Sequence, residues 1–368
     1  GYQDINCPSY QAVRFETFSP GGRIWLLRAF LEGEIPISAR LSEILFSCAA
    51  CGNCTEHCAF PKFKDRLLSA FIAGRGELIE AGALPATVKK VFESAHAYGN
   101  AFGFPREERG KWAEGLGLEP FGRQDYLLYI GCEGSFDERG QKMARALAGL
   151  LRTWGVSFGV LGAREQDDGN EIRAMGESAL FEQLAKENIE AFLRTGVKKI
   201  IALSPHAYYV FKNVYPWLGG AFQVLHYSQL LQQLLAARAL GGSEKLLKVT
   251  YHDPCYLGRH SGEYEAPRQF IRALPGVDLV EMDRIRADAL CCGGGGGNFY
   301  TGMLAGGSDN PARVRVREAA ETGASGLAVA CPACAKMLDD AVRAEEMEEK
   351  LRVLDLAELL TSPSLVRD

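Results

Sequence analysis

The sequence lacks the features that would place the chain in a membrane or export it from the cell. No apolar run of about 18 residues occurs, and the stretch GYQDINCPSY shows no basic start followed by an apolar segment. The net charge of -5 and the interspersed acids and bases give no basic surface for nucleic acid. We therefore expect no transmembrane segment within this chain, and a location in the cytoplasm or at the cytoplasmic face of a membrane complex.

The chain also has no flavin or nicotinamide motif, and its run of five glycines lacks the Lys-Ser/Thr pair that completes a phosphate-binding P-loop. What it has is cysteine. Without a secretion signal, a reducing compartment disfavours disulfides, so clustered thiols indicate metal or redox chemistry. The eleven cysteines are Cys7, Cys48, Cys51, Cys54, Cys58, Cys132, Cys255, Cys291, Cys292, Cys331 and Cys334.

The first cluster of cysteines lies in CAACGNCTEHCAFP, with the spacing C-x2-C-x2-C-x3-C and a proline soon after. This is the bacterial ferredoxin spacing, in which three thiolates bind one cubane [4Fe-4S] cluster while the fourth usually binds a different cluster. A zinc site and four buried thiols are the alternatives. Zinc sites are typically built from paired C-x2-C halves, which this spacing fits less well.

Cys7 and Pro8 resemble the end of a second such motif. In that arrangement Cys7 completes the cluster held by the first three cysteines of CAACGNCTEHCAFP, and Cys58 joins another cluster. Gln3 occupies the place where the usual spacing puts a cysteine. The alternative is a single cluster closed by Cys58, with Cys7 a buried thiol. We expect one cubane, or two if upstream residues complete the second motif.

The distribution of apolar residues predicts an α+β multidomain protein. GGRIWLLRAFLEGE has the pattern of an amphipathic helix, whereas from residue 124 short apolar runs alternate with helical stretches. Such alternation is typical of α/β units on mainly parallel sheets. The expected parts are an all-helical ferredoxin-like module (1–98), a linker (99–123), a first lobe (124–240) and a second lobe (241–368).

The two lobes share the same order of predicted strands, helices and loops, but the first lobe lacks most of the cysteines of the second. Five second-lobe cysteines follow predicted strands, in three loops that we expect at one rim of the sheet. At matching places the first lobe has Cys132, Asp167, Asp168, Ser204 and Ala207. Serine is a hard, rarely ionised ligand and alanine is none, so only the second lobe should bind metal. We expect Cys132 to be buried at a strand end, the alternative being a leftover thiol near the interface of the lobes. The two aspartates could bind an ion, but we expect them to form a solvated turn.

A ferredoxin-like module followed by two domains with C, CCG and CxxC elements resembles the B and D subunits of heterodisulfide reductase. Similar iron-sulfur proteins include electron-transfer-flavoprotein:quinone oxidoreductases of the same build. The resemblance implies that the complete pattern binds a noncubane [4Fe-4S] cluster able to accept a sulfur substrate. Carried over by position, the implied ligands, also the catalytic set, are Cys255, Cys291, Cys292, Cys331 and Cys334.

Residues beside these cysteines have further expected roles. His252 and His260 could donate a proton to a thiolate released by reductive cleavage, or else hold the loop by hydrogen bonds. The glycines Gly293, Gly294 and Gly295 allow close approach of the backbone to a cluster and can aim amides at sulfur. Three further cations, which could steer an anionic substrate or form a solvated helix face, are Arg313, Arg315 and Arg317.

The sequence therefore predicts an iron-sulfur oxidoreductase subunit in which electrons pass between a cubane and a noncubane cluster. The expected reaction is reduction of a disulfide or oxidation of two thiols. The alternative is an electron-relay subunit without a substrate of its own. Since the chain has no flavin motif, it needs a redox partner, either a flavoprotein or a quinone-reactive membrane subunit.

Overall fold

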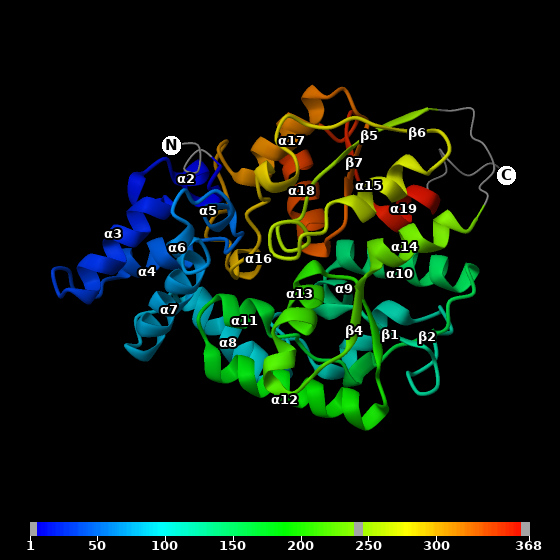
Figure 1. Cartoon of the computed structure of the whole chain (residues 1–368), viewed down its shortest axis with the longest axis horizontal. Coiled ribbons are helices and arrows are strands. Elements are labelled where there is room, and N and C mark those ends of the chain that lie inside the picture. The colour runs from blue at the N-terminus through cyan, green and yellow to red at the C-terminus, as the bar shows by residue number, and fades with distance from the viewer. Residues whose placement is uncertain (1–5, 239–245, 362–368) are drawn as a thin grey trace.

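The computed structural model describes residues 6–238 and 246–361 (Figure 1). Its N-terminal part is helical, as predicted. The helices there are α2 (Pro8–Val13), η1 (Glu16–Phe18), α3 (Pro20–Leu31), α4 (Ala39–Phe46), α5 (Asn53–Glu56), α6 (Pro61–Lys64), α7 (Leu67–Glu80) and α8 (Ala86–Tyr98). Serines begin two of them: Ser19 accepts from the amide of Gly22, and Ser38 from that of Leu41.

The first lobe is built on a four-stranded parallel sheet with strand order β2-β1-β3-β4. The strands are β1 (Tyr126–Tyr129), β2 (Phe158–Gly159), β3 (Lys199–Ala202) and β4 (Gln223–His226). The helices around it are η2 (Arg106–Ala113), α9 (Gly131–Phe136), α10 (Glu138–Thr153), η3 (Gly162–Arg164), α11 (Asn170–Ala174), α12 (Ser178–Thr195), α13 (Pro205–Asn213), η4 (Tyr215–Leu218) and α14 (Tyr227–Ala236).

The second lobe repeats this topology with the order β6-β5-β7-β8, again all parallel. Its strands are β5 (Leu247–Tyr251), β6 (Val277–Leu279), β7 (Gly326–Val329) and β8 (Arg352–Asp355). Its helices are α15 (Glu265–Arg272), η5 (Arg286–Asp288), α16 (Asn298–Thr301), α17 (Pro311–Glu321), α18 (Pro332–Ala344) and α19 (Leu356–Thr361). The predicted α+β architecture with two related parallel-sheet lobes is confirmed.

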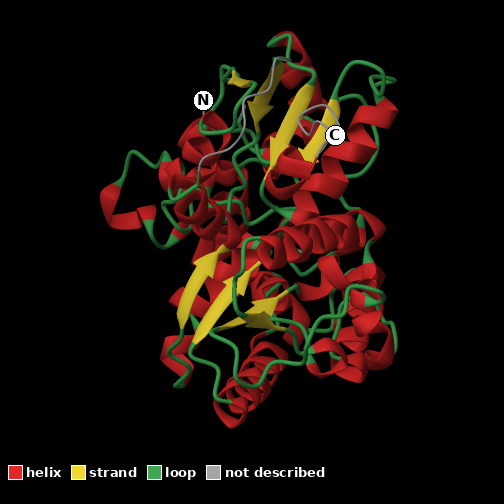
Figure 2. Ribbon diagram, turned by 90° about the vertical axis from the view of Figure 1, so that its right-hand side faces the viewer, coloured by secondary structure: helices red, strands yellow, loops and turns green. Residues whose placement is uncertain are grey.

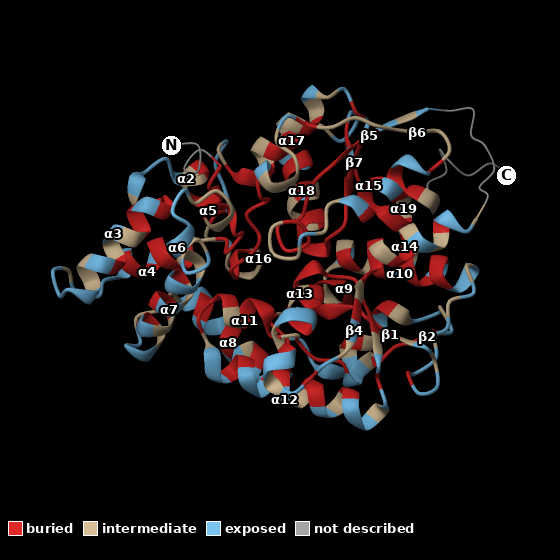
Figure 3. Ribbon diagram, in the orientation of Figure 1, coloured by how far each residue is buried: buried red, intermediate tan, exposed pale blue. Residues whose placement is uncertain are grey.

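The two sheets lie in separate lobes with helices between them (Figure 2). The inner strands are almost wholly buried, as expected for parallel strands covered on both faces. Helix α10 packs against α18 and α19 across the lobes, and Arg139 pairs there with Asp339 and Glu358. The buried residues of the two lobes form a continuous region with those of the loop that follows α4 (Figure 3).

The stretch expected as a linker packs onto the first lobe. It contains η2, whose Arg109 and Trp112 are buried. No helix among the described residues is long and apolar enough to cross a membrane.

Candidate metal centres

Four cysteines of the N-terminal part line one cavity. These are Cys7, Cys48, Cys51 and Cys54. Cys58 does not line it: the Cys58 thiol lies beside Phe60, accepting from that residue's amide at 3.4 Å. Helix α2 places Cys7, its N-cap residue, opposite the loop after α4, and Gly52 bends that loop with φ +74° before α5. The structure thus groups Cys7, rather than Cys58, with the first three cysteines of the motif.

Two fully buried arginines flank this cavity without pairing to a carboxylate among the described residues. Arg23 donates to two backbone oxygens and to the hydroxyls of Ser9 and Ser47. Arg75 donates only to backbone oxygens, including that of Cys48. Burial lowers the pKa of Arg75. Because a buried charge needs a counter-charge, these two cations fit a cavity whose thiols are ionised and bound to metal.

The second-lobe cysteines converge at the carboxyl edge of the second sheet. Cys255 follows β5, and Cys331 is the N-cap residue of α18, which carries Cys334 in its first turn. The sulfurs of Cys291 and Cys255 are 3.7 Å apart, and those of Cys292 and Cys334 are 3.4 Å apart. All five thiols are at most 6% exposed. Three loops therefore bring five buried thiols to one place, an arrangement suited to a multi-iron centre.

Hydrogen bonds among these thiols separate their acidities. The Cys291 thiol donates to Cys255, and this bond lowers the pKa of Cys255 to about 6. Interactions with Cys291 and Cys334 hold the pKa of Cys292 well below its usual range. Cysteine ligands that are already partly ionised favour metal binding, because cysteine binds metal as the thiolate.

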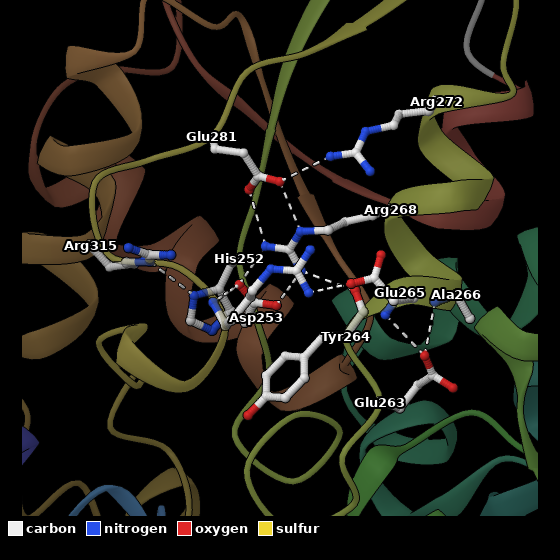
Figure 4. A network of polar contacts seen from close by, with 11 residues as sticks. His252, Asp253, Glu263, Tyr264, Glu265, Ala266, Arg268, Arg272, Glu281 and Arg315 are labelled. Carbon is white, nitrogen blue, oxygen red and sulfur yellow. Dashed lines mark hydrogen bonds and ion pairs between the residues drawn. The ribbon is translucent and has the colours of Figure 1, made fainter. Parts of the chain in front are cut away.

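His252 belongs to this second site. Its ring, Cys292 and Cys334 offer ligand atoms within 4.8 Å of one another. The Nδ1 atom accepts a hydrogen bond from Nε of Arg315 at 3.3 Å, as Figure 4 shows. In the neutral ring Nε2 then carries the proton and is a donor toward the thiols. His252 is therefore suited to hydrogen-bond a ligand sulfur rather than to bind iron itself.

The loop that carries His252 is held by a buried ion-pair network. Arg268 pairs with Asp253 at 2.6 Å and with Glu281 at 2.8 Å (Figure 4). The carboxylate of Asp253 also accepts from the amide of Arg286. This network fixes the segment that runs from β5 to Cys255.

His260 is placed differently from His252. Its Nε2 lies 2.9 Å from the backbone oxygen of Ala50, and its ring stacks on Tyr256 with centroids 4.2 Å apart. Burial lowers the pKa of His260 to about 3, so the ring is neutral at neutral pH. The structure thus sets His260 against the first cysteine loop, where it joins the two sites.

The glycine run also packs against the first cysteine loop. A Cβ on Gly295 would lie 2.6 Å from the backbone oxygen of Ala49, and one on Gly296 would collide with that of Cys48. Gly296 has φ +63°. Of the three glycines expected to aim amides at sulfur, Gly293 donates to Cys291 at 3.4 Å. These glycines therefore act mainly by allowing the two cysteine loops to pack closely together.

The first lobe holds an ion-pair network at the place where the second lobe holds its thiols. Ser204 is the N-cap residue of α13 and precedes a proline, just as Cys331 does for α18. The Cys132 thiol lies 3.1 Å from Asp167 and accepts from Arg109 at 2.9 Å. The expected burial of Cys132 is correct, but the expected solvated turn is wrong: Asp167 is buried, because its carboxylate bonds to Cys132 and to a backbone amide.

Among the three arginines of α17, Arg315 departs from the expected solvated face, whereas Arg313 and Arg317 are partly exposed. Arg315 is fully buried and contacts His252, while Arg313 and Arg317 both pair with Glu345. Arg315 therefore holds the ring of His252 in place and is inaccessible to a substrate.

Sequence reasoning assigned no site role to His206, which the structure brings to the second site. From the first lobe this ring hydrogen-bonds Cys255 and packs on Tyr256 at 4.2 Å. Burial alone would lower the pKa of His206, but Glu171 and Cys255 raise it well above its usual range. Residues 204–207 (SPHA) occupy the place that residues 331–334 (CPAC) occupy in the second lobe, so His206 stands beside a ligand position of the repeat. This correspondence is the signal that could have identified it.

Comparison with known proteins agrees with this geometry. The family model described as "Cysteine-rich domain" (CCG) matches residues 126–212 and 249–339, one copy in each lobe. The chain is 34% identical over 89% of its length to the probable iron-sulfur-binding oxidoreductase FadF of Bacillus subtilis, and 35% identical over 87% to the EtfAB:quinone oxidoreductase of Syntrophomonas wolfei. It covers 47% and 46% of those proteins, and so spans about half their length.

A third relative is matched over almost its whole length. The D subunit of the dihydromethanophenazine:CoB--CoM heterodisulfide reductase of Methanosarcina barkeri is 28% identical over 96% of this chain and 90% of its own length. Both copies of the CCG domain fall within that match. The chain belongs to the family of CCG-domain iron-sulfur proteins that resemble the D subunit of heterodisulfide reductase.

Proposed function

We propose that the chain is the electron-transferring part of an iron-sulfur oxidoreductase complex. In this proposal the cavity lined by Cys7 holds a cubane [4Fe-4S] cluster, and the five second-lobe cysteines hold a noncubane [4Fe-4S] cluster. When bound, such clusters take up and release single electrons. The observation that carries the proposal is the contact between the two cysteine loops, in which a Cβ on Gly295 would lie 2.6 Å from the backbone oxygen of Ala49.

The chain's own residues keep the two sites adjacent and dry. His260 and the glycine run bind the first cysteine loop to the second lobe, and the five thiols of the second site are buried. A buried site in contact with a second redox site favours a relay over chemistry on a substrate that diffuses in.

A relay needs a partner on each side. The relatives' names include an EtfAB:quinone oxidoreductase at 35% identity. We infer that one partner is an electron-transferring flavoprotein and that the other is a quinone-reactive membrane subunit, in line with the name of that relative.

A second candidate function is reduction of a disulfide, as in heterodisulfide reductase. The observation that favours it is a surface pocket lined by Met337, Arg313 and Asp340. A Cβ on Gly294 would lie 3.2 Å from Met337 and 3.7 Å from the sulfur of Cys292, so Met337 stands next to the thiol site. Reduction of a disulfide to two thiols takes two electrons and two protons, and His252 is the donor beside Cys292.

Anaerobic purification with whatever proteins co-elute separates these candidates. Iron and acid-labile sulfide are measured first, and EPR spectra are then recorded with a reduced flavoprotein and with a thiol such as coenzyme M. Reduction of both centres by the flavoprotein, with no response to thiol, supports the relay. A second-site signal that changes with thiol supports disulfide chemistry. Zinc in place of iron and sulfide contradicts both.

A further inference from the structure

Arg259 connects the two cysteine sites. Its Nε donates to the backbone oxygen of Cys51 at 2.8 Å, in the first cysteine loop. Its Nη1 donates to the backbone oxygens of Ala287 at 3.0 Å and Ala289 at 2.8 Å, in the segment that leads to Cys291. One guanidinium therefore ties both cysteine loops together.

The third nitrogen of this guanidinium has no acceptor in the part of the chain that the structure describes. Nη2 of Arg259 is buried there without a hydrogen-bond partner, although leaving a buried donor unpaired destabilises a folded protein. Among the described residues no carboxylate forms an ion pair with Arg259. Burial alone would lower the pKa of Arg259, but Cys51, Cys255 and Cys291, which lie on both sides of the boundary between the sites, raise it above its usual range.

We propose that Nη2 of Arg259 donates to a cluster sulfur and that its guanidinium is the shared counter-charge of both clusters. This inference rests on the proposed function, because it requires two clusters. A fixed cation stabilises the more negative, reduced form of a nearby centre, so Arg259 raises both reduction potentials. The positive charge of Arg259 also offsets the electrostatic repulsion between two negatively charged clusters. This matters for electron exchange, because both clusters must be reducible over the same range of potential.

Arg75 provides a matched control. It is also buried and also lacks a carboxylate ion pair among the described residues, but its donors reach Cys48 and three other backbone oxygens outside the second site. Removing the charge of Arg75 should therefore affect the first centre alone.

The test is an EPR-monitored redox titration of the cluster-loaded protein and its R259Q, R259K and R75Q variants. In R259Q both midpoint potentials should fall, and in R75Q only that of the first centre. R259K keeps the charge but loses the Nη2 donor, so its midpoints should stay near those of the unmodified protein while its EPR line shape changes.

The outcomes distinguish the inference from the proposed function. If R259Q keeps normal iron and sulfide but shifts one midpoint or neither, Arg259 is not a shared counter-charge. If R259Q does not incorporate its clusters, the R259K variant provides the test. An unchanged EPR line shape in R259K would overturn the proposed hydrogen bond from Nη2 to a cluster sulfur. Absence of either centre from the unmodified protein contradicts the proposed function instead.

Discussion

Gly296, in the CCG element of the second lobe, lies against Cys48, in the ferredoxin-type motif of the N-terminal part, so closely that an added Cβ would meet the backbone oxygen of Cys48. Nearby, the side chain of Cys291 lowers the pKa of Cys51 to about 7. The two cysteine sites are therefore in contact, and a change at this contact should affect both.

Gly296→Ala tests the contact between the two cysteine loops. The new Cβ would collide with the backbone oxygen of Cys48 at a residue with φ +63°, so the loops must separate. We expect a loss of about 2 kcal/mol or more in stability and weakening of both EPR signals. The matched control is Gly306→Ala, where φ is +89° but nothing lies within 4 Å of the added Cβ. Equal effects of the two substitutions would show that only backbone conformation matters.

The choice between Cys7 and Cys58 as fourth ligand is tested by two serine variants. Because Cys7 lines the cavity and Cys58 does not, Cys7→Ser should lose the cubane signal and most of its iron. Cys58→Ser should keep that signal. Iron analysis and EPR of both proteins give the answer, and the reverse pattern would return Cys58 to the first site.

Much of this arrangement follows from local sequence patterns. The spacing around Cys48 and the alternation of apolar runs with helices depend on neighbouring residues, so they predict the cysteine loop and both parallel-sheet lobes. The repeat likewise puts Ser204 and Cys331 at equivalent places, and in the structure each is the N-cap residue of a helix that begins with a proline.

The contacts between the parts could not be predicted in this way. His206 reaches Cys255 only because the lobes face each other, and Gly296 meets Cys48 only because the helical part docks on the second lobe. Asp167 was expected in solvent since an Asp-Asp-Gly turn is usually exposed. Its burial depends on Cys132 and on Arg109, which comes from the stretch expected as a linker.

Two serine variants test the prediction that, of the two lobes, only the second binds metal. Cys292→Ser should abolish the signal of the second centre while the cubane signal remains, because Cys292 does not line the first cavity. The matched control is Cys132→Ser in the first lobe, where a hydroxyl can still bond to Asp167 and both signals should persist. Loss of a cluster in the control would mean that the first lobe also binds metal.

A contact between the lobes predicts how stability depends on pH. The hydroxyl of Tyr227, in α14, donates to the carboxylate of Asp355, at the end of β8. Burial and the negative charge of Glu358 raise the pKa of Asp355 from 3.8 to about 7, so the folded protein keeps a proton that the unfolded chain has released. The stability gained from this protonation is complete below about pH 3.8 and is lost as the pH rises through about 7, by up to about 1.4 kcal/mol per pH unit.

Asp355→Asn isolates this effect, because asparagine retains an acceptor and a donor for Tyr227 but does not titrate. Relative to the unmodified protein, its Tm should rise between pH 4 and pH 8, measured anaerobically at equal cluster content. Asp340→Asn, at an exposed carboxylate of α18, is the control and should show a nearly constant difference. A Tm difference for Asp355→Asn that does not change with pH would mean that Asp355 is already ionised in the folded protein, and that the joint between the lobes is held by a charged carboxylate.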